Sequence, residues 1–349
     1  MGFNKRIKQN ATIAMVLTAL LMPFGISTVV AAAKPKPAPL PVTEFVNFQK
    51  VKPGSGKGLT LGYISLGDSV PFVKLVSDSI KAQAKIAGVK LEFCDSQLDS
   101  AKALACAQAF KVKKVQGYLN FQLDAGAGPA IYAAGPQVPV IAVDIVQSPK
   151  ELAFMGANNH RAGVVTGIGL GNMIKKKFAC KYDAILSMES PGVGAVNEAR
   201  IGGVKEGFAS VCGPIELAKL HTIDASFIAQ GQASVQAAMT TLPDAHTIVV
   251  FAMNDDSVLG AFKAAAQLGR PTDLYAAGQG ADPTSWCQIV NNPNWAGDTA
   301  YFPEHYGEIG IPYLIAAVKK VQIPALLQVN HTWIDKTNIA KYYPKSKSC

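Results

Sequence analysis

The sequence predicts an α/β protein of two lobes, each a doubly wound parallel sheet with flanking helices. Two observations predict it. From Leu59 onward, short apolar runs alternate with stretches of helical period, which is typical of parallel sheets covered by helices. This alternation fills two successive halves of similar size, and the second half starts near Ala153. Two such halves indicate two lobes with a cleft between them.

The individual elements follow from apolar runs of strand length and from amphipathic stretches between them. Strands are expected at 60–66, 90–96, 116–121, 138–144, 182–188, 215–221, 246–253 and 274–280. Helices are expected at 71–87, 99–113, 126–134, 160–176, 196–211, 229–242, 256–268 and 303–320. A final pair of extended segments finishes the chain.

The N-terminal segment has the pattern of a secretory signal. Three basic residues among the first eight precede an apolar run over 11–33, which Pro23 and Gly25 interrupt and which ends in three alanines. An uncleaved membrane anchor is the alternative, because the run nearly reaches spanning length. The helix breakers and the small residues at its end favour cleavage. We therefore expect a signal peptide at 1–33, followed by a Pro-rich linker or loosely attached arm at 34–57.

Composition bounds the partners. The formal net charge is +9 and 16% of residues are charged, but the basic residues form no stripe with interleaved aromatics. A nucleic-acid partner is therefore not expected. No second apolar run reaches spanning length, so we expect the mature chain to be soluble.

The chain has six cysteines, and in an exported protein these predict disulfides. No CxxC pair occurs and the histidines are scattered, so neither a metal site nor a cofactor is expected. Of the fifteen possible connectivities, the preferred pairs are Cys94–Cys106, Cys180–Cys212 and Cys287–Cys349. Buried free thiols are the alternative, above all for the last pair.

Two glycine-rich stretches fail as nucleotide motifs. The run GSGK at 54–57 lacks the earlier glycine and the final Ser or Thr of a phosphate-binding loop, and it precedes a strand. Gly167, Gly169 and Gly171 lie inside a predicted helix and not at a strand-to-helix turn. Close packing of that helix on the sheet explains these glycines better.

Candidate functional residues follow from the rule that ligands bind beyond the carboxyl ends of parallel strands. These ends carry Asp68, Phe72, Asp95, Asp144, 189–200, 224–227, Asn254, Asp255 and 279–282. They hold many Asp, Asn, Arg and aromatic residues but no GxSxG elbow and no Cys–His pair, so nucleophilic catalysis has no visible machinery. Carboxylates, amides and guanidinium groups suit reversible binding of hydroxyl groups.

From about Leu59 to Asp335, the chain resembles the periplasmic sugar-binding proteins of the ribose- and galactose-binding type, which serve ABC importers. The strongest segment is FAMNDDSVLGAFKAAAQLGRPTDLYAAGQGADP (251–283), with its strand, Asn-Asp pair, Leu-Gly-Ala helix and second strand. Supporting segments lie at 61–72, 91–110, 138–145, 158–167 and 197–208. The resemblance implies the type I periplasmic binding protein fold, with lobes at 58–152 plus 302–327 and at 153–301 plus 328–349. Three hinge segments, near 153, 301 and 328, would cross between them.

The resemblance also implies a ligand set where the motifs match. Phe72 resembles the aromatic that stacks on the sugar, Asp144 the carboxylate that accepts from its hydroxyls, and Arg200 the arginine of the second lobe. The remaining candidates are Phe227, Asn254, Tyr301, Asp68 and Asp282. Each has a structural alternative: Asn254 could cap the following helix, Phe72 could be core, and Arg200 could sit on a solvated face.

Two positions depart from the family pattern. Gly280 stands where the family's Gly-Phe-Asp-Gly strand end has its aspartate, and Ile145 follows Asp144 where some pentose binders have an arginine. With these polar partners missing, a different polyol, a cyclitol or a less polar ligand becomes conceivable.

The resemblance implies a periplasmic or other extracytoplasmic protein that captures a small carbohydrate or polyol and delivers it to an ABC permease. A chemoreceptor is a further conceivable partner, and a monomer is expected. Alternatives are a receptor for a nucleoside, amino acid derivative or aromatic compound, or an exported α/β hydrolase. A sugar-responsive repressor is disfavoured, because a signal sequence and no helix-turn-helix precedes the core.

Overall fold

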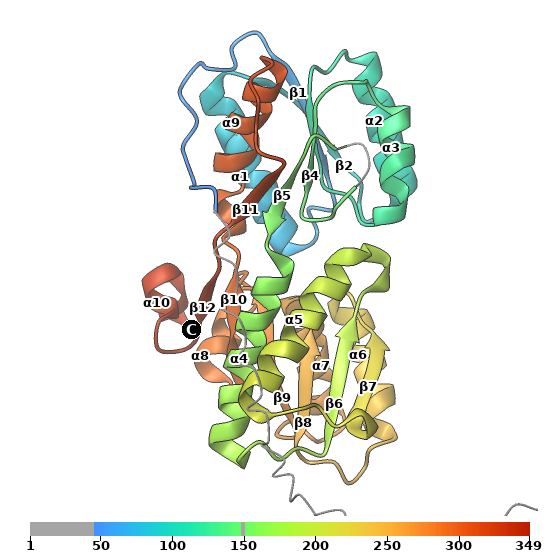
Figure 1. Ribbon diagram of the computed structural model, residues 1–349, viewed down its shortest axis with the longest axis vertical. Coiled ribbons are helices and arrows are strands. Elements are labelled where there is room, and N and C mark those ends of the chain that lie inside the picture. Colours follow the sequence, from blue (N-terminus) through green and yellow to red (C-terminus); the bar gives the residue numbers. More distant parts are fainter. Residues whose placement is uncertain (1–44, 148–150) are drawn as a thin grey trace, which may run out of the picture. The chain divides into compact units, whose positions relative to one another are not determined.

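Two six-stranded sheets organise the protein, and helices cover both faces of each (Figure 1). The computed structural model describes residues 45–147 and 151–349. The predicted signal peptide at 1–33 and the first part of the predicted linker lie outside the described residues. We call the sheet that contains β1, together with its helices, the first lobe. The sheet that contains β6, together with its helices, is the second lobe.

The first lobe has an all-parallel sheet of strand order β11-β5-β4-β3-β1-β2. Its strands are β1 Thr60–Ser65, β2 Lys90–Asp95, β3 Tyr118–Asn120, β4 Val140–Val143, β5 Ala153–Ala157 and β11 Leu326–Val329. Its helices are α1 Pro71–Ala87, α2 Ser100–Val112, α3 Gly128–Ala134 and α9 Gly307–Val318, with short 3-10 helices η1 Ala125–Ala127 and η4 Pro303–His305. Helices α1 and α9 pack on one face, and α2 and α3 on the other.

The second lobe repeats this design with strand order β12-β10-β9-β8-β6-β7, in which only β12 is antiparallel. Its strands are β6 Ala184–Glu189, β7 Leu220–Asp224, β8 Ile248–Ala252, β9 Leu274–Gly280, β10 Trp295–Ala300 and β12 Thr332–Ile334. Its helices are α4 Asn159–Phe178, α5 Ala195–Cys212, α6 Ile228–Thr240, α7 Asp255–Gln267, α8 Trp286–Asn291 and α10 Ile339–Tyr342. The 3-10 helices are η2 Pro191–Val193, η3 Leu217–Lys219 and η5 Pro344–Ser348.

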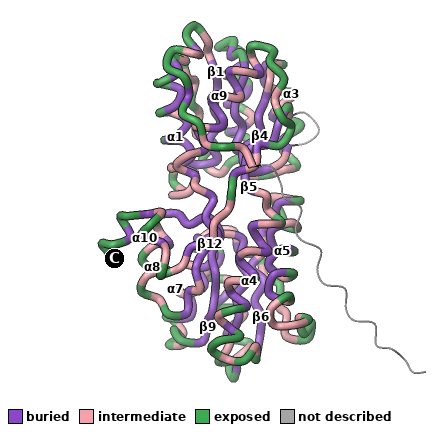
Figure 2. The backbone as a smooth tube through the Cα atoms, turned by 60° about the vertical axis from the view of Figure 1, so that its left-hand side comes forward, coloured by how far each residue is buried: buried purple, intermediate pink, exposed green. Residues whose placement is uncertain are grey.

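Burial explains why the strands read as continuous apolar runs. Strands β4, β5 and β8 are buried at every residue, because helices cover both faces of a parallel sheet (Figure 2). The exposed residues lie on the outer faces of the helices, in the loops and on the edge strands β2, β7 and β11. Among the described residues, no helix is both long enough and apolar enough to span a membrane.

The chain crosses between the sheets after β5, after β10 and between β11 and β12. Residues 153–157 and 328–329, predicted for the second lobe, belong to the first lobe. Residues 153–157 form β5, which pairs with β4 and β11, and residues 328–329 end β11. An apolar run of five residues does not reveal which sheet it joins, since both lobes bury such runs equally well.

The described part of the predicted linker is packed and not loose. Val51 is 4% exposed and belongs to the first-lobe core, and its N–H donates to the Gln83 side chain at 2.9 Å. The Val46 N–H donates to the Gln328 carbonyl at 3.0 Å, on β11 at the end of the sheet order. Residues 45–57 therefore join the first lobe, because their apolar side chains and backbone groups find partners there.

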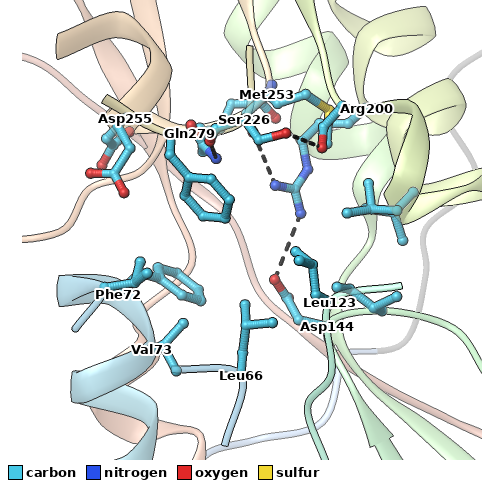
Figure 3. A pocket seen from close by; sticks show the side chains of 18 of the residues that line it. Leu66, Phe72, Val73, Leu123, Asp144, Arg200, Ser226, Met253, Asp255 and Gln279 are labelled. Atoms are coloured by element: carbon cyan, nitrogen blue, oxygen red, sulfur yellow. Dashed lines mark hydrogen bonds and ion pairs between the residues drawn. The ribbon is translucent and has the colours of Figure 1, made fainter. Parts of the chain in front are cut away.

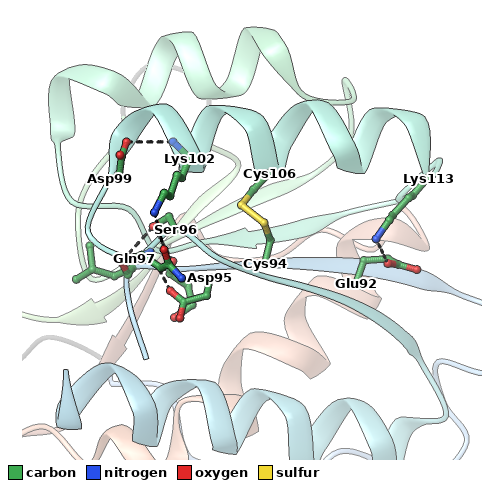
Figure 4. The surroundings of a disulfide bond; sticks show 11 residues. Glu92, Cys94, Asp95, Ser96, Gln97, Asp99, Lys102, Cys106 and Lys113 are labelled. Carbon is green, nitrogen blue, oxygen red and sulfur yellow. Dashed lines mark hydrogen bonds and ion pairs between the residues drawn. A yellow bond between two sulfur atoms is a disulfide. The ribbon is translucent and has the colours of Figure 1, made fainter. Parts of the chain in front are cut away.

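All six cysteines form disulfides, and the pairs are the ones that the sequence analysis preferred. Cys94–Cys106 ties β2 to α2 (Figure 4). The other two bonds are Cys180–Cys212, which joins the ends of α4 and α5, and Cys287–Cys349, which holds the C-terminal residue against α8. Each bond staples elements of the same lobe, so none links one lobe to the other.

The α4 glycines Gly167 and Gly171, predicted to pack on the sheet, pack against helix α5. A Cβ at Gly163 would overlap the Arg200 carbonyl, and a Cβ at Gly167 would overlap the Val204 carbonyl. Only Gly169 faces the sheet, against Trp333 of β12. The two helix backbones thus approach closely, and this contact sets the position of the turn of α5 that carries Arg200.

Candidate functional site

A cavity lies where the carboxyl ends of the strands of the two lobes face each other (Figure 3). The first lobe contributes Leu66, Val70, Phe72, Val73, Phe121, Leu123, Asp144, Ile145 and Tyr301 of the crossing segment after β10. The second lobe contributes Ser190, Val193, Val196, Arg200, Ser226, Phe227, Met253, Asn254, Asp255, Asp256, Gln279 and Asp282. The structure therefore brings seven of the eight predicted ligand residues to one cavity, which is the arrangement that the strand-end rule predicts.

Arg200 enters the cavity from α5 and is 6% exposed. Its Nε and Nη2 groups donate to Asn159 Oδ1 at 3.0 and 2.6 Å, and its Nη1 group donates to the Met253 carbonyl at 3.0 Å. Its guanidinium also lies 5.1 Å from the centre of the Tyr301 ring. These contacts fix the planar group in one orientation, so it is preorganised for a ligand.

Asp144 follows β4 and is the only charged residue among the described first-lobe residues that line the cavity. Its φ of 60° places it in the left-handed region, and its N–H donates to the Met155 carbonyl at 2.8 Å. The Tyr306 hydroxyl donates to Asp144 Oδ1 at 3.3 Å. Burial raises the pKa of the Asp144 carboxyl above its ordinary value, while the Arg200 guanidinium opposes part of this shift.

Aromatic rings form one end of the cavity. Phe72, at the start of α1, meets the rings of Tyr301 and Tyr306 edge-on at centroid distances of 6.3 and 6.0 Å. The Tyr301 hydroxyl donates to Gln279 Oε1 at 2.8 Å. Phe227 lines the cavity from the second lobe, at the residue before α6. The site thus offers apolar ring faces that suit one side of a flat or cyclic solute.

Asn254 lines the cavity, but its amide is engaged within the protein. Asn254 Oδ1 accepts from the Ser257 N–H at 2.9 Å and so caps α7. Its Nδ2 group donates to the Ser226 carbonyl at 2.9 Å. The capping alternative raised for this residue is therefore correct for its side-chain oxygen.

Asp68 does not line the cavity, contrary to its prediction as a ligand residue. Its carboxylate accepts from the hydroxyls of Ser65 and Ser77 and from the Lys81 ammonium, at 2.7, 2.5 and 3.0 Å. Burial opposes ionisation, but the hydrogen bonds from Ser77, Ser65 and Lys81 outweigh it and lower the pKa of Asp68. The sequence indicates an acidic residue after β1 but not the α1 residues that draw it away.

Gly280 ends β9 with φ +136°, a conformation that favours glycine. A Cβ there would lie 3.5 Å from Phe72 and 3.3 Å from Asp255, so the missing side chain leaves room between these two lining residues. Gln279, the residue before it, uses Nε2 to donate to the Ala252 carbonyl and Oε1 to accept from Tyr301. This strand end therefore contributes shape and not a carboxylate at position 280.

Several lining residues went unpredicted as ligand residues. Asp256 stands in the first turn of α7, where an acidic residue has a sufficient explanation in the helix dipole. Val70, Val73, Leu123 and Val193 read as ordinary core residues. The only available signal was their spacing of a few residues from a strand end.

Two doubly wound lobes, three crossing segments and a cavity at the facing strand ends define the class of type I periplasmic binding proteins. The chain belongs to the periplasmic binding protein domain family, whose profile matches residues 61–321. The predicted family resemblance is thereby confirmed.

Individual relatives agree. The ribose import binding protein of Escherichia coli is 27% identical over 263 residues, which cover 74% of this chain and 85% of that protein. An ABC transporter solute-binding protein of Mycobacterium smegmatis with bound glycerol has a TM-score of 0.70 at 18% identity, with 81% of this chain and 96% of that chain covered. One from Bacillus halodurans with bound myo-inositol has a TM-score of 0.68 at 17% identity, with 83% and 99% covered. At these identities, the two solved structures show the fold.

Proposed function

We propose that this protein is an exported solute-binding protein that captures a small carbohydrate or polyol between its lobes and delivers it to an ABC permease. The observation that carries this proposal is the pairing of Asp144 from the first lobe with Arg200 from the second lobe in one cavity. Nη2 of Arg200 lies 3.9 Å from Asp144 Oδ2. A hydroxyl group placed between them would donate to the carboxylate and accept from the guanidinium.

Capture works through desolvation and preorganisation. A sugar ring would lay an apolar face on Phe72 and direct its hydroxyls toward Asp144 and Arg200. Each ligand hydroxyl that loses water must regain hydrogen bonds inside, because an unpaired buried polar group costs about 1–3 kcal/mol. Since the ligand contacts both lobes, it favours the arrangement in which the lobes approach, and that arrangement is the form that a permease would recognise.

Export is supported by the N-terminal pattern and by the cysteines. Three disulfides persist in oxidising compartments and are rare in the reducing cytosol. The relatives support the transport role, since one is a ribose import binding protein and the two solved structures are ABC transporter solute-binding proteins. We therefore infer a periplasmic or other extracytoplasmic location.

A different class of solute is the second candidate, and the first-lobe wall favours it. That wall is apolar except at Asp144 and at the Tyr301 hydroxyl, which already donates to Gln279, and Ile145 adds a further apolar side chain. Catalysis has less support. No histidine is among the described lining residues, and the lining serines, Ser190 and Ser226, hydrogen-bond to each other.

The test is a binding screen on the purified protein with D-ribose, D-glucose, D-galactose, myo-inositol, amino acids and nucleosides. We expect a thermal shift from a sugar or polyol, abolished by Asp144→Ala and by Arg200→Ala and retained by Asp244→Ala, a change at an exposed position. Recovering the solute unchanged by mass spectrometry would support binding. A shift confined to amino acids or nucleosides, or conversion of the solute, would overturn the proposal.

A further inference from the structure

The two walls of the cavity differ in chemistry. The first-lobe wall holds one carboxylate, Asp144, amid aliphatic and aromatic side chains. The second-lobe wall holds three, Asp255, Asp256 and Asp282, and its only cationic lining side chain is Arg200. The described lining thus carries more carboxylates than cations, and a neutral solute would leave this imbalance in place.

Arg200 does not balance the carboxylates of its own wall. Its donors go to Asn159 and the Met253 carbonyl, and its nearest carboxylate is Asp144 of the opposite lobe. Among the described residues, no Lys, Arg or His side chain forms an ion pair with Asp255, Asp256 or Asp282. The nearest counter-charge is that of Lys263, which lowers the pKa of Asp256 only in part and forms no direct ion pair with this wall in the described protein.

Asp255 has a structural explanation. Its Oδ2 accepts from the Asp282 N–H at 3.0 Å, its Oδ1 has no hydrogen-bond partner in the described protein, and its carboxyl lies beside that of Asp298, a buried residue of β10. Burial and the adjacent Asp298 raise the pKa of Asp255 well above its ordinary value. The raised pKa favours the protonated form of Asp255, and its Oδ2 already accepts from a backbone N–H, so Asp255 is less suited than Asp256 to a cation.

Asp256 has no such explanation. It is 7% exposed, it lines the cavity, and its buried Oδ1 has no hydrogen-bond partner in the described protein. Its neighbour Asp282 also lines the cavity and is buried, and Asp282 uses Oδ1 to accept from the Thr284 N–H at 2.8 Å. A desolvated carboxylate without a donor, close to a second carboxylate, is costly unless a cation with several donors completes it.

A protonated primary amine meets these requirements. It carries one positive charge and three donors, whereas a hydroxyl supplies a single donor and no charge. A metal ion fits less well, because the described residues contain no group of three or more His, Cys, Asp or Glu side chains arranged to hold one. The amine must belong to a molecule with an apolar face, since Phe72 and Val73 line the opposite wall.

We infer that the solute captured here is an amino sugar or an aminocyclitol, whose ammonium group lies against Asp256 and Asp282 of the second lobe. This inference rests on the proposed capture of a carbohydrate or polyol in the same cavity. It assigns Asp256 as a specificity-determining residue: its carboxylate selects the amine over the hydroxyl at that ring position.

The experiment measures dissociation constants by calorimetry for matched pairs that differ at one group. The pairs are D-glucosamine with D-glucose, D-galactosamine with D-galactose, and 1-amino-1-deoxy-scyllo-inositol with scyllo-inositol. We expect the amine of at least one pair to bind at least tenfold more tightly than its hydroxyl partner. Asp256→Asn should reduce that preference to less than threefold, and Asp244→Asn, at an exposed position, should leave it intact.

The outcomes separate this inference from the proposed function. If the sugar or cyclitol binds as well as its amine partner in every pair that binds, the inference is overturned and carbohydrate capture still stands. Failure of every pair, with the protein folded by circular dichroism, overturns the inference, and a shift from nucleosides or amino acids alone then overturns the proposed function too. An amine preference that survives Asp256→Asn shows that another group reads the amine and overturns the role of Asp256.

Discussion

Arg200 of the second lobe and Asp144 of the first lobe form an ion pair with Nη2 and Oδ2 3.9 Å apart (Figure 3). The distance is at the limit of a direct ion pair, while the hydrogen bonds of Arg200 within its own lobe are 2.6–3.0 Å long. Arg200 is therefore held by its own lobe and presented to the other. A ligand that bridges the two groups can strengthen an interaction that the protein alone makes weakly.

We expect removal of Arg200 to lower the unfolding free energy by more than its weak ion pair with Asp144 contributes. Arg200→Ala leaves the buried Asp144 carboxylate without its cation, a change that costs about 3 kcal/mol of unfolding free energy in comparable buried pairs. Asp144→Asn removes the charge and should cost less. Urea unfolding of the two single variants and the double variant gives the coupling energy, which we expect to be about 1 kcal/mol. Strict additivity would contradict an interaction between the two residues.

The close contact between helices α4 and α5 leads to a second prediction. Gly163→Ala would place a Cβ against the Arg200 carbonyl, so the helices must separate, at a cost of about 1–3 kcal/mol in unfolding free energy. It should also weaken ligand binding, since Arg200 moves with α5.

Gly202→Ala is the matched control for that change. Gly202 lies in the same helix as Arg200, and a Cβ there meets nothing within 4 Å. Alanine in place of glycine in an open helical position should stabilise the protein by about 0.5–1 kcal/mol. Chemical denaturation of both variants decides the matter: equal effects would mean that the helix contact is not responsible.

Some helices and strands could be predicted from the sequence, and others could not. Helix 71–87 and strand 274–280 were predicted to the residue. For the helix, Pro71 marks the start and Gly88, in the left-handed conformation, the end. Strand β7 begins at Leu220 and not at 215, because residues 217–219 form a 3-10 turn. Strand β10 was missed, since WAGDTA has little β-branched character and owes its conformation to pairing with β9.

In the candidate site, the position of a residue at a strand end could be predicted from the sequence, but the direction of its side chain could not. Position at a strand end predicts that Phe72, Asp144 and Asn254 reach the cavity, because the topology brings those ends together. The direction of a side chain depends on partners distant in sequence, which is why Asp68 turns to Ser77 and Lys81. No local pattern distinguishes Asp256 from a residue that merely favours a helix N-terminus.

The Cys94–Cys106 disulfide should stabilise the first lobe. It closes a loop with a sequence separation of 12 residues, and the loss of chain entropy in the unfolded state predicts about 3 kcal/mol. We expect the Cys94→Ser/Cys106→Ser variant to lose about 3 kcal/mol of unfolding free energy and therefore to unfold at a lower denaturant concentration. The unfolding midpoint of the second lobe should change little. Tryptophan fluorescence can follow that lobe, because Trp286, Trp295 and Trp333 all lie in it. An unchanged midpoint of the first lobe would mean that the bond adds no stability.

The pH dependence of stability tests the carboxylates without any ligand. Burial first, and then the charge of Asp282, raise the pKa of Asp256 from an ordinary 3.8 to about 6, with Lys263 opposing. The folded state therefore binds more protons than the unfolded state between these values, so the contribution of Asp256 to stability falls as pH rises from about 4 to 6 and is then constant. Asp255 and Asp298 change stability in the same direction, since their pKa values are also raised.

The difference in unfolding free energy between wild type and Asp256→Asn isolates the contribution of Asp256: the variant should become the more stable protein as pH rises through that window. Urea unfolding at pH 4.5, 5.5, 6.5 and 7.5 measures it. A difference that does not vary with pH would mean that Asp256 is ordinarily solvated, and would remove the reason for an ammonium group beside it.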